Sequence, residues 1–269
     1  MTATTAPSPP ELAPTVSPIE GLRQTCTLAW RTLVQIRHNP WELSDFSIQP
    51  IMFVLLFTYV FGGAIAGGTS QYLTFALPGI IVMNMLFVTM YVGTGLNTDL
   101  TKGVFDRLRS LPVARWAPLA GRITADLVKQ AWSITLLLSV GAILGFRIET
   151  SALALLGAVA LLLVFALAFS WVSVLVGLLA KDPEKVQLFG FTALFPITFV
   201  SNVFVPASTM PTWLQAFVDV NPVTILADAT RGLMRGGAVA GPVMGSLLWA
   251  AVFVVVFAPL SVWAFRRRV

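Results

Sequence analysis

The sequence has 269 residues, of which 57% are hydrophobic and 11% are charged, and its formal net charge is +5. A soluble domain carries about 25% charged residues, so a chain with less than half that share and a mean hydropathy of +0.83 is predicted to be an integral membrane protein. One cysteine and one histidine exclude an intramolecular disulfide and the ligand clusters of usual zinc and haem sites. On so apolar a chain, the excess of basic residues is expected to determine the orientation of the chain in the membrane. We therefore expect no nucleic-acid partner.

The first 18 residues are predicted to form a disordered tail. The sequence MTATTAPSPPELAPTVSP lacks the basic start and apolar core of a cleavable signal peptide, and it is rich in Pro, Thr and Ala.

Long runs without charge predict six membrane-spanning helices, because a span needs about 20 mostly apolar residues. The run from 46 to 98 divides into two spans at the glycines of GGAIAGGTS, and later runs provide four more. The fifth is expected to end where VPASTMP breaks the helix. The six expected spans are 48–65, 72–96, 127–146, 152–179, 186–205 and 243–265.

The basic residues predict the orientation, since lysine and arginine are retained on the cytoplasmic side. With the N-terminus inside, all of the 17 basic residues except Arg147, Arg231 and Arg235 fall on the cytoplasmic side. The chain is therefore predicted to be a multi-pass protein of the plasma (inner) membrane with both termini in the cytoplasm.

The segment NPVTILADATRGLMRGG, 221–237, is helix-like but carries three charged residues. An unpaired charge at mid-bilayer costs about 2.5–3.5 kcal/mol, so we do not expect a seventh span. PTWLQAFVDV and NPVTILADATRGLM are instead predicted to be two short helices that dip into the outer leaflet and break at Asn221-Pro222. Trp213 and Phe217 lie four residues apart on one face of the first, as in an interfacial helix.

The most charged segment, GVFDRLRSLPVAR at 103–115, falls in a predicted cytoplasmic loop of about thirty residues between the second and third spans. Val104, Leu108 and Leu111 recur at helical spacing, and Pro112 ends the turn, which predicts a short amphipathic helix. The residues alone leave two roles open. The helix could lie at the membrane interface with snorkelling arginines, or it could dock on a soluble partner through apolar and basic side chains.

The sequence KGVFDRLRSLPVARWAPLAGRITADL, 102–127, resembles the loop of permeases in the type-2 ABC exporter family, in particular the daunorubicin-resistance branch of drug and lipid exporters. NVFVPASTMPTWLQAFVDVNPVTILADATRGLMRGG, 202–237, resembles the second signature of that branch. The resemblance covers nearly everything after Ile19. It implies an all-α permease domain, 19–269, with six spans, a cytoplasmic amphipathic helix, a coupling helix seated on an ATP-hydrolysing subunit, and two re-entrant helices before the last span.

Within this resemblance, the amphipathic entry helix corresponds to 19–39, where apolar residues repeat at three- and four-residue steps. These residues are Ile19, Leu22, Cys26, Trp30, Leu33 and Ile36. The coupling helix corresponds to 103–111. The residues expected to couple it to the ATPase are Val104, Phe105, Asp106, Arg107, Leu108 and Arg109. The two arginines are assigned to ionic docking, and Phe105 and Leu108 to apolar docking.

Two neighbouring features bear on this loop. Many relatives have an acidic residue about two positions before the glycine of the loop, where this chain has Thr101 followed by Lys102. Arg122 and Asp126 lie four residues apart, and they are expected either to pair or to form an ordinary solvated helix face.

The resemblance also implies a substrate path between paired permease subunits, lined mainly by the second and fifth spans. The residues expected there are Asn84, Thr89, Tyr91, Thr94, Phe195, Thr198 and Asn202. Aromatic and methionine side chains with few polar groups suit a hydrophobic drug, lipid or polyketide. The alternative is that these side chains only pack together or face membrane lipid.

The sequence contains no G-x-x-x-x-G-K-[ST], so we expect this chain to bind no cofactor, and ATP and magnesium to bind two copies of a separate ABC ATPase subunit. Six spans form half of a conduit in this family, so a second permease subunit, identical or related, is also expected. Neither G-x-S-x-G nor H-E-x-x-H occurs, which argues against an enzyme. No acidic residue falls at a predicted span centre, which disfavours a secondary carrier. A polysaccharide-exporting ABC permease remains the main alternative.

Overall fold

The computed structural model describes residues 17–37, 40–109, 113–114 and 116–268, and the regular secondary structure throughout these ranges is helical. The predicted tail lies outside the described residues up to position 16. The predicted all-α fold is confirmed for the described part of the chain.

Within the described ranges, five helical segments are long and apolar enough to cross a membrane. The first, Ser47–Ala66, combines the end of α2 (Pro40–Leu56), a π-helical turn η1 (Phe57–Phe61) and α3 (Gly62–Ala66). The other four are α4 (Thr69–Thr101), α6 (Ala117–Ile143), α7 (Ala152–Leu179) and α11 (Ala240–Arg268). These segments confirm a multi-span membrane protein, and they overlap five of the six predicted spans.

The predicted fifth span, 186–205, is helical only as far as Phe199. The helix there, α8 (Pro183–Phe199), has 17 residues, which is the lower limit of the length that a span needs. Pro196 lies in its last turn, and 200–206 is not helical. The six-span topology therefore stays a prediction.

Two short helices follow where the sequence predicts them, α9 (Thr212–Val220) and α10 (Pro222–Arg235). Asn221 separates them, and its side-chain oxygen accepts a hydrogen bond of 2.9 Å from the Val223 amide. This bond caps α10. Pro222 occupies the first helical position, where a backbone N–H would have no partner within the helix, so its absence in proline costs no hydrogen bond. The short helix pair is confirmed, and its place in the outer leaflet remains a prediction.

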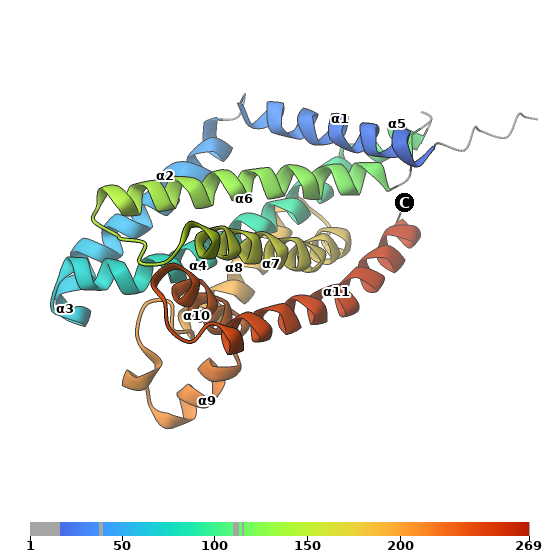
Figure 1. Ribbon diagram of the computed structural model, residues 1–269. Coiled ribbons are helices and arrows are strands. Elements are labelled where there is room, and N and C mark those ends of the chain that lie inside the picture. Colours follow the sequence, from blue (N-terminus) through green and yellow to red (C-terminus); the bar gives the residue numbers. More distant parts are fainter. Residues whose placement is uncertain (1–16, 38–39, 110–112, 115, 269) are drawn as a thin grey trace, which may run out of the picture.

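The central helix of the bundle is α4, with α6, α7, α8 and α10 packed around it, and α11 packs against α7 (Figure 1). The closest approach is between α4 and α7. Ser173 Oγ accepts from the Gly93 amide (2.9 Å), and Asn97 Nδ2 donates to the Gly177 carbonyl (2.9 Å). A Cβ atom added to Gly93 or Gly177 would clash with the backbone of the facing helix. The two glycines therefore fix how closely these helices pack.

The predicted amphipathic helix is present as α1 (Pro18–Arg37), which lies alongside the first half of α6 (Figure 1). Small residues form the contact: a Cβ on Gly121 of α6 would lie 3.0 Å from the Thr25 carbonyl oxygen and 3.2 Å from the Ala29 amide nitrogen. The predicted apolar stripe points elsewhere, since Ile19 and Trp30 are 80% and 68% exposed. The first part of the stripe is therefore exposed, whereas Leu33 near its end packs against the cluster of Val88.

The helix that contains most of the predicted third span begins before that span. The predicted third span begins at 127, but the helix already begins at Ala117. Arg122, in the additional turns, forms an ion pair with Asp99 of α4 and not with Asp126. Because its charge finds a partner inside the bundle, Arg122 does not end the helix, and the connection from α4 shortens to 102–116.

Candidate functional site

A groove of about 630 Å³ runs between α2, α4 and α8. Its α4 side is one face of that helix, because the lining residues recur at three- and four-residue steps. They are Ile80, Met83, Asn84, Phe87, Val88, Met90, Tyr91 and Thr94. The α8 side is built in the same way from Glu184, Gln187, Leu188, Gly190, Phe191, Phe195 and Phe199. Gln49, Pro50 and Phe53 of α2 complete the lining.

Four of the seven residues predicted to line a substrate path lie at this groove: Asn84, Tyr91, Thr94 and Phe195. Asn84 also reaches α6, where its Nδ2 donates to Ser133 Oγ (2.8 Å). The helical faces predicted from the second and fifth spans therefore do meet, and contact of these residues with a substrate stays a prediction.

The other three predicted path residues lie away from the groove and are engaged within the chain. The Thr89 hydroxyl donates to the Met85 carbonyl (2.9 Å) and accepts from Gln130 Nε2 (2.8 Å). The Thr198 hydroxyl donates to the Leu194 carbonyl (2.7 Å). These two side chains are fully buried, and Asn202 belongs to the polar network described below.

Phenylalanine rings form a continuous row along α8. The Phe191 and Phe195 centroids are 5.2 Å apart, and the Phe195 and Phe199 centroids are 4.1 Å apart. The row continues over Phe204, after the end of α8, to Phe57 beside α2. Phe195 is the one member of this row among the predicted path residues. The four-residue spacing of Phe191, Phe195 and Phe199 places them on one face of a helix, and this spacing identifies the row along α8 in the sequence.

The first turn of α8 places charged groups at one end of the groove. Asp182 caps the helix, accepting from the Lys185 amide (3.0 Å) and from its Nζ (2.8 Å). Hydrogen bonds from the Lys185 side chain and then its amide hold the pKa of the Asp182 carboxyl below its usual range. Glu184, in the same turn, lines the groove. Glu184 lies just before the predicted fifth span, 186–205, and is not among the predicted path residues.

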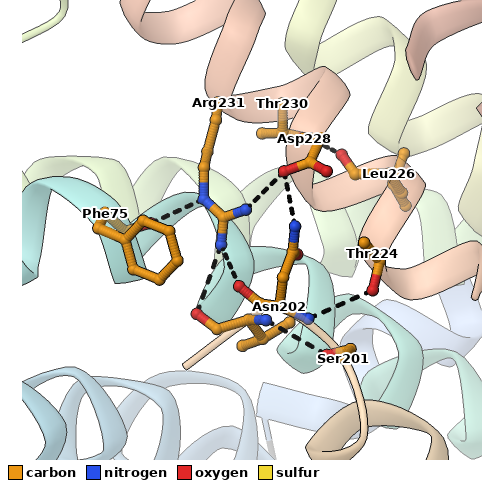
Figure 2. A network of polar contacts seen from close by, with 9 residues as sticks. Phe75, Ser201, Asn202, Thr224, Leu226, Asp228, Thr230 and Arg231 are labelled. Carbon is orange, nitrogen blue, oxygen red and sulfur yellow. Dashed lines mark hydrogen bonds and ion pairs between the residues drawn. The ribbon is translucent and has the colours of Figure 1, made fainter. Parts of the chain in front are cut away.

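Arg231 of α10 holds together three separate parts of the chain (Figure 2). Its Nε donates to the Phe75 carbonyl of α4 (2.9 Å), and its Nη1 pairs with Asp228 (2.8 Å). Its Nη2 donates to the Asn202 carbonyl (2.6 Å), and Asn202 Nδ2 in turn donates to Asp228 (2.8 Å). The guanidinium also lies 4.2 Å from the centroid of the Phe75 ring. The network therefore fixes the segment after α8 against α4, which positions the aromatic end of the groove.

The predicted coupling helix is present as α5 (Val104–Arg109), near the C-terminal end of α11 (Figure 1). Gly103 ends α4 in the left-handed conformation (φ 65°), which glycine adopts without a steric penalty. Arg107 is exposed and Val104 is partly buried. The side chains of Asp106, Leu108 and Arg109 lie outside the described residues, as do 110–112.

Phe105 of α5 faces the helix bundle. It is 7% exposed and packs edge to face on Phe265 of α11, in a cluster with residues of α4, α6 and α7. A ring buried in this way offers little surface to a partner, and apolar docking through Phe105 stays a prediction. Its contacts fasten α5 to the bundle.

The end of the loop, just before α6, contacts α1. The Ala114 amide donates to Gln24 Oε1 of α1 (2.9 Å), and the Trp116 ring lies against Gly21. Separately, Arg268 Nη1 at the end of α11 donates to the carbonyl of Ala180 (2.9 Å), which joins α11 to the end of α7. The ring contact of α5 itself is with Phe265 of α11.

Comparisons with known proteins bear on both sites. The family model described as ABC-2 type transporter matches residues 23–234. The daunorubicin resistance ABC transporter permease protein DrrB1 of Streptomyces coeruleorubidus is 41% identical over 244 residues, covering 91% of this chain and 86% of that protein. The probable doxorubicin resistance ABC transporter permease protein DrrC of Mycobacterium tuberculosis is 28% identical over 225 residues, covering 82% and 80%.

Proposed function

Because the chain belongs to the ABC-2 type transporter family, we propose that this membrane-spanning permease moves hydrophobic drugs or similar lipid- or polyketide-like molecules out of the cell, driven by a separate ATPase. The observation that carries the proposal is the aromatic groove between α2, α4 and α8. Its volume of about 630 Å³ falls in the range of about 300–1,000 Å³ typical of sites for drug-sized ligands. The printed names of the relatives, which include resistance to daunorubicin and doxorubicin, support this substrate class.

The proposed topology has six spans in the plasma membrane with both termini in the cytoplasm. Here α8 is the fifth span: its 17 residues extend about 25 Å at 1.5 Å per residue, and the non-helical 200–206 covers the remaining depth. In this arrangement α5 is cytoplasmic, and α9 and α10 lie at the outer leaflet. The exposed part of the stripe on α1 then faces the headgroups of the inner leaflet.

The proposed partner is an ABC ATPase in two copies, which binds ATP and magnesium. Arg107 of α5, exposed at the surface, is assigned to ionic docking on this partner. A second permease subunit, identical or related, completes the conduit. Closure of the ATPases would move α5, and the contacts of α5 with α11 and of its loop with α1 would carry that movement into the spans.

Purification of the tagged chain from its native membrane in mild detergent tests this function. We expect a stoichiometric ATPase to purify with it, and hydrolysis of ATP to increase when doxorubicin is added. The variant R107E should lose the ATPase from the complex, since it reverses a docking charge. The matched control is R147A, which removes an exposed arginine between α6 and α7 and should retain the partner. Recovery of the wild-type chain without an ATPase would overturn the proposal.

A further inference from the structure

Glu184 is the only charged side chain among the described residues that line the groove. The rest of the lining is aromatic, aliphatic or neutral polar. Lys185, the neighbouring cation, is paired with Asp182, and none of the described residues forms an ion pair with Glu184. The groove therefore combines a large apolar wall with a single negative charge.

The charged carboxylate lies at one end of the groove. Glu184 and Gln187 lie in the first two turns of α8, at the end where Thr94 closes the α4 side. Phe195 and Phe199 lie at the opposite end of α8. The charged group thus lies at one end of the groove, and the row of phenylalanine rings runs along α8 toward the other, while the neutral amide of Asn84 also lines the α4 side. A ligand that satisfies both ends must itself have a charged end and an apolar, ring-containing body.

We propose that Glu184 makes this groove selective for amphipathic organic cations, with the positive group of the ligand at Glu184 and its aromatic rings against Phe191 and Phe195. A carboxylate beside an apolar surface favours a cation over an anion of the same shape, and aromatic faces also attract cations. This inference rests on the proposed transport function, and it assigns the substrate class and one specificity-determining residue. The main alternative role of Glu184 is to stabilise α8, because an acidic residue in a first turn interacts favourably with the helix dipole.

Two ions of almost identical shape separate these roles. Tetraphenylphosphonium and tetraphenylborate have the same four rings and opposite charges. The binding of each to the purified full-length permease in detergent can be measured by equilibrium dialysis without the ATPase, and each variant is compared with the wild type for the same ion.

We expect E184Q to weaken binding of the phosphonium about tenfold, which corresponds to about 1.4 kcal/mol, and to leave binding of the borate unchanged or tighter. E184D retains the charge and should restore most of the phosphonium affinity. F191A should weaken both ions, because it removes apolar and aromatic contact area. The control D219N removes an exposed carboxylate on α9, away from the groove, and should change neither.

Equal weakening of both ions by E184Q would show that Glu184 acts on α8 itself and would overturn the proposal. An unchanged affinity for both ions in F191A would show that lipid or a second copy of the chain fills the groove, and would also overturn it. The two proposals can fail separately. Ion binding is measured on the permease alone and tests the role of Glu184, whereas co-purification of an ATPase tests the proposed function.

Discussion

The Phe105 ring of α5 and the Phe265 ring of α11 lie 5.6 Å apart, edge to face, at an interplanar angle of 73°. This contact joins the short helix proposed to meet the ATPase to the last membrane-spanning segment. An aromatic pair of this kind contributes about 0.5–1.5 kcal/mol beyond its buried area. The contact therefore adds to the apolar burial that holds α5 against the bundle, and Arg107 lies exposed on the same helix.

The variant F105A should uncouple the transporter without dissociating it. Because the ring faces the bundle and not the partner, we expect the ATPase still to co-purify, while drug-stimulated hydrolysis falls about 3–10-fold. F105L, which keeps an apolar side chain, should lie between F105A and the wild type. Loss of the ATPase from the F105A complex would contradict the inward placement of this ring.

A double-mutant cycle tests the contact itself. F105A, F265A and the combined variant should give less than additive losses in drug-stimulated hydrolysis, because either change alone removes the same ring pair. Additive losses would show that the two rings act independently.

Replacing Arg231 should destabilise the protein. R231A removes a side chain that bonds to α4, to 202–203 and to Asp228, and bonds to charged groups contribute about 1.5–3 kcal/mol each when buried. Because Asp228 is 43% exposed, we expect a total loss of about 2 kcal/mol, seen as a lower thermal unfolding midpoint in detergent. The control R235A breaks a more exposed ion pair with Glu149 and should cost less than about 1 kcal/mol. Equal midpoints for the two variants would refute a special role for Arg231.

The contact between α4 and α7 predicts opposite outcomes for two glycines of the same helix. G177A places a Cβ against the backbone of Gly93, and we expect a loss of about 1–3 kcal/mol from overpacking. G157A meets only Leu233, at 3.9 Å, and should be neutral or stabilising by up to about 1 kcal/mol. Unfolding midpoints of the two variants check this order, and a stable G177A would show that the helices lie farther apart.

Transport should depend on the groove and not on the buried threonine nearby. F195A removes a ring of the groove wall, so export of doxorubicin by cells should fall several-fold while the protein is still present at normal levels. T198V removes a hydroxyl that bonds only to carbonyls of its own helix and should export normally. If T198V loses export and F195A retains it, the path does not run along this groove.

Local chemistry in the sequence predicts much of this fold. The break between α9 and α10 is encoded by Asn221 and Pro222, which act on adjacent backbone groups, and long apolar runs identify five membrane-crossing segments. That the helix extends back from 127 to Ala117 depends on the ion pair of Arg122 with Asp99 of α4, which local sequence does not reveal. The side that Phe105 faces depends in the same way on Phe265, which lies 160 residues away in the sequence.

The groove was predictable only in part. Helical spacing identifies one face of α4, but which other faces meet it depends on how α2 and α8 pack. Thr89 and Thr198 have polar side chains that look suited to a path, yet each satisfies its hydrogen bonds inside the bundle. Glu184 was not selected because its significance arises from the aromatic surface beside it, and not from any local motif.

The central claim is that this permease transports drugs with energy from ATP hydrolysed by a partner docked on α5. Uptake of doxorubicin into inside-out vesicles containing the full complex tests it most directly. We predict uptake that requires ATP, persists when an ionophore collapses the proton gradient, and is lost in R107E but not in R147A. Uptake that proceeds without ATP and disappears with the proton gradient would contradict the account.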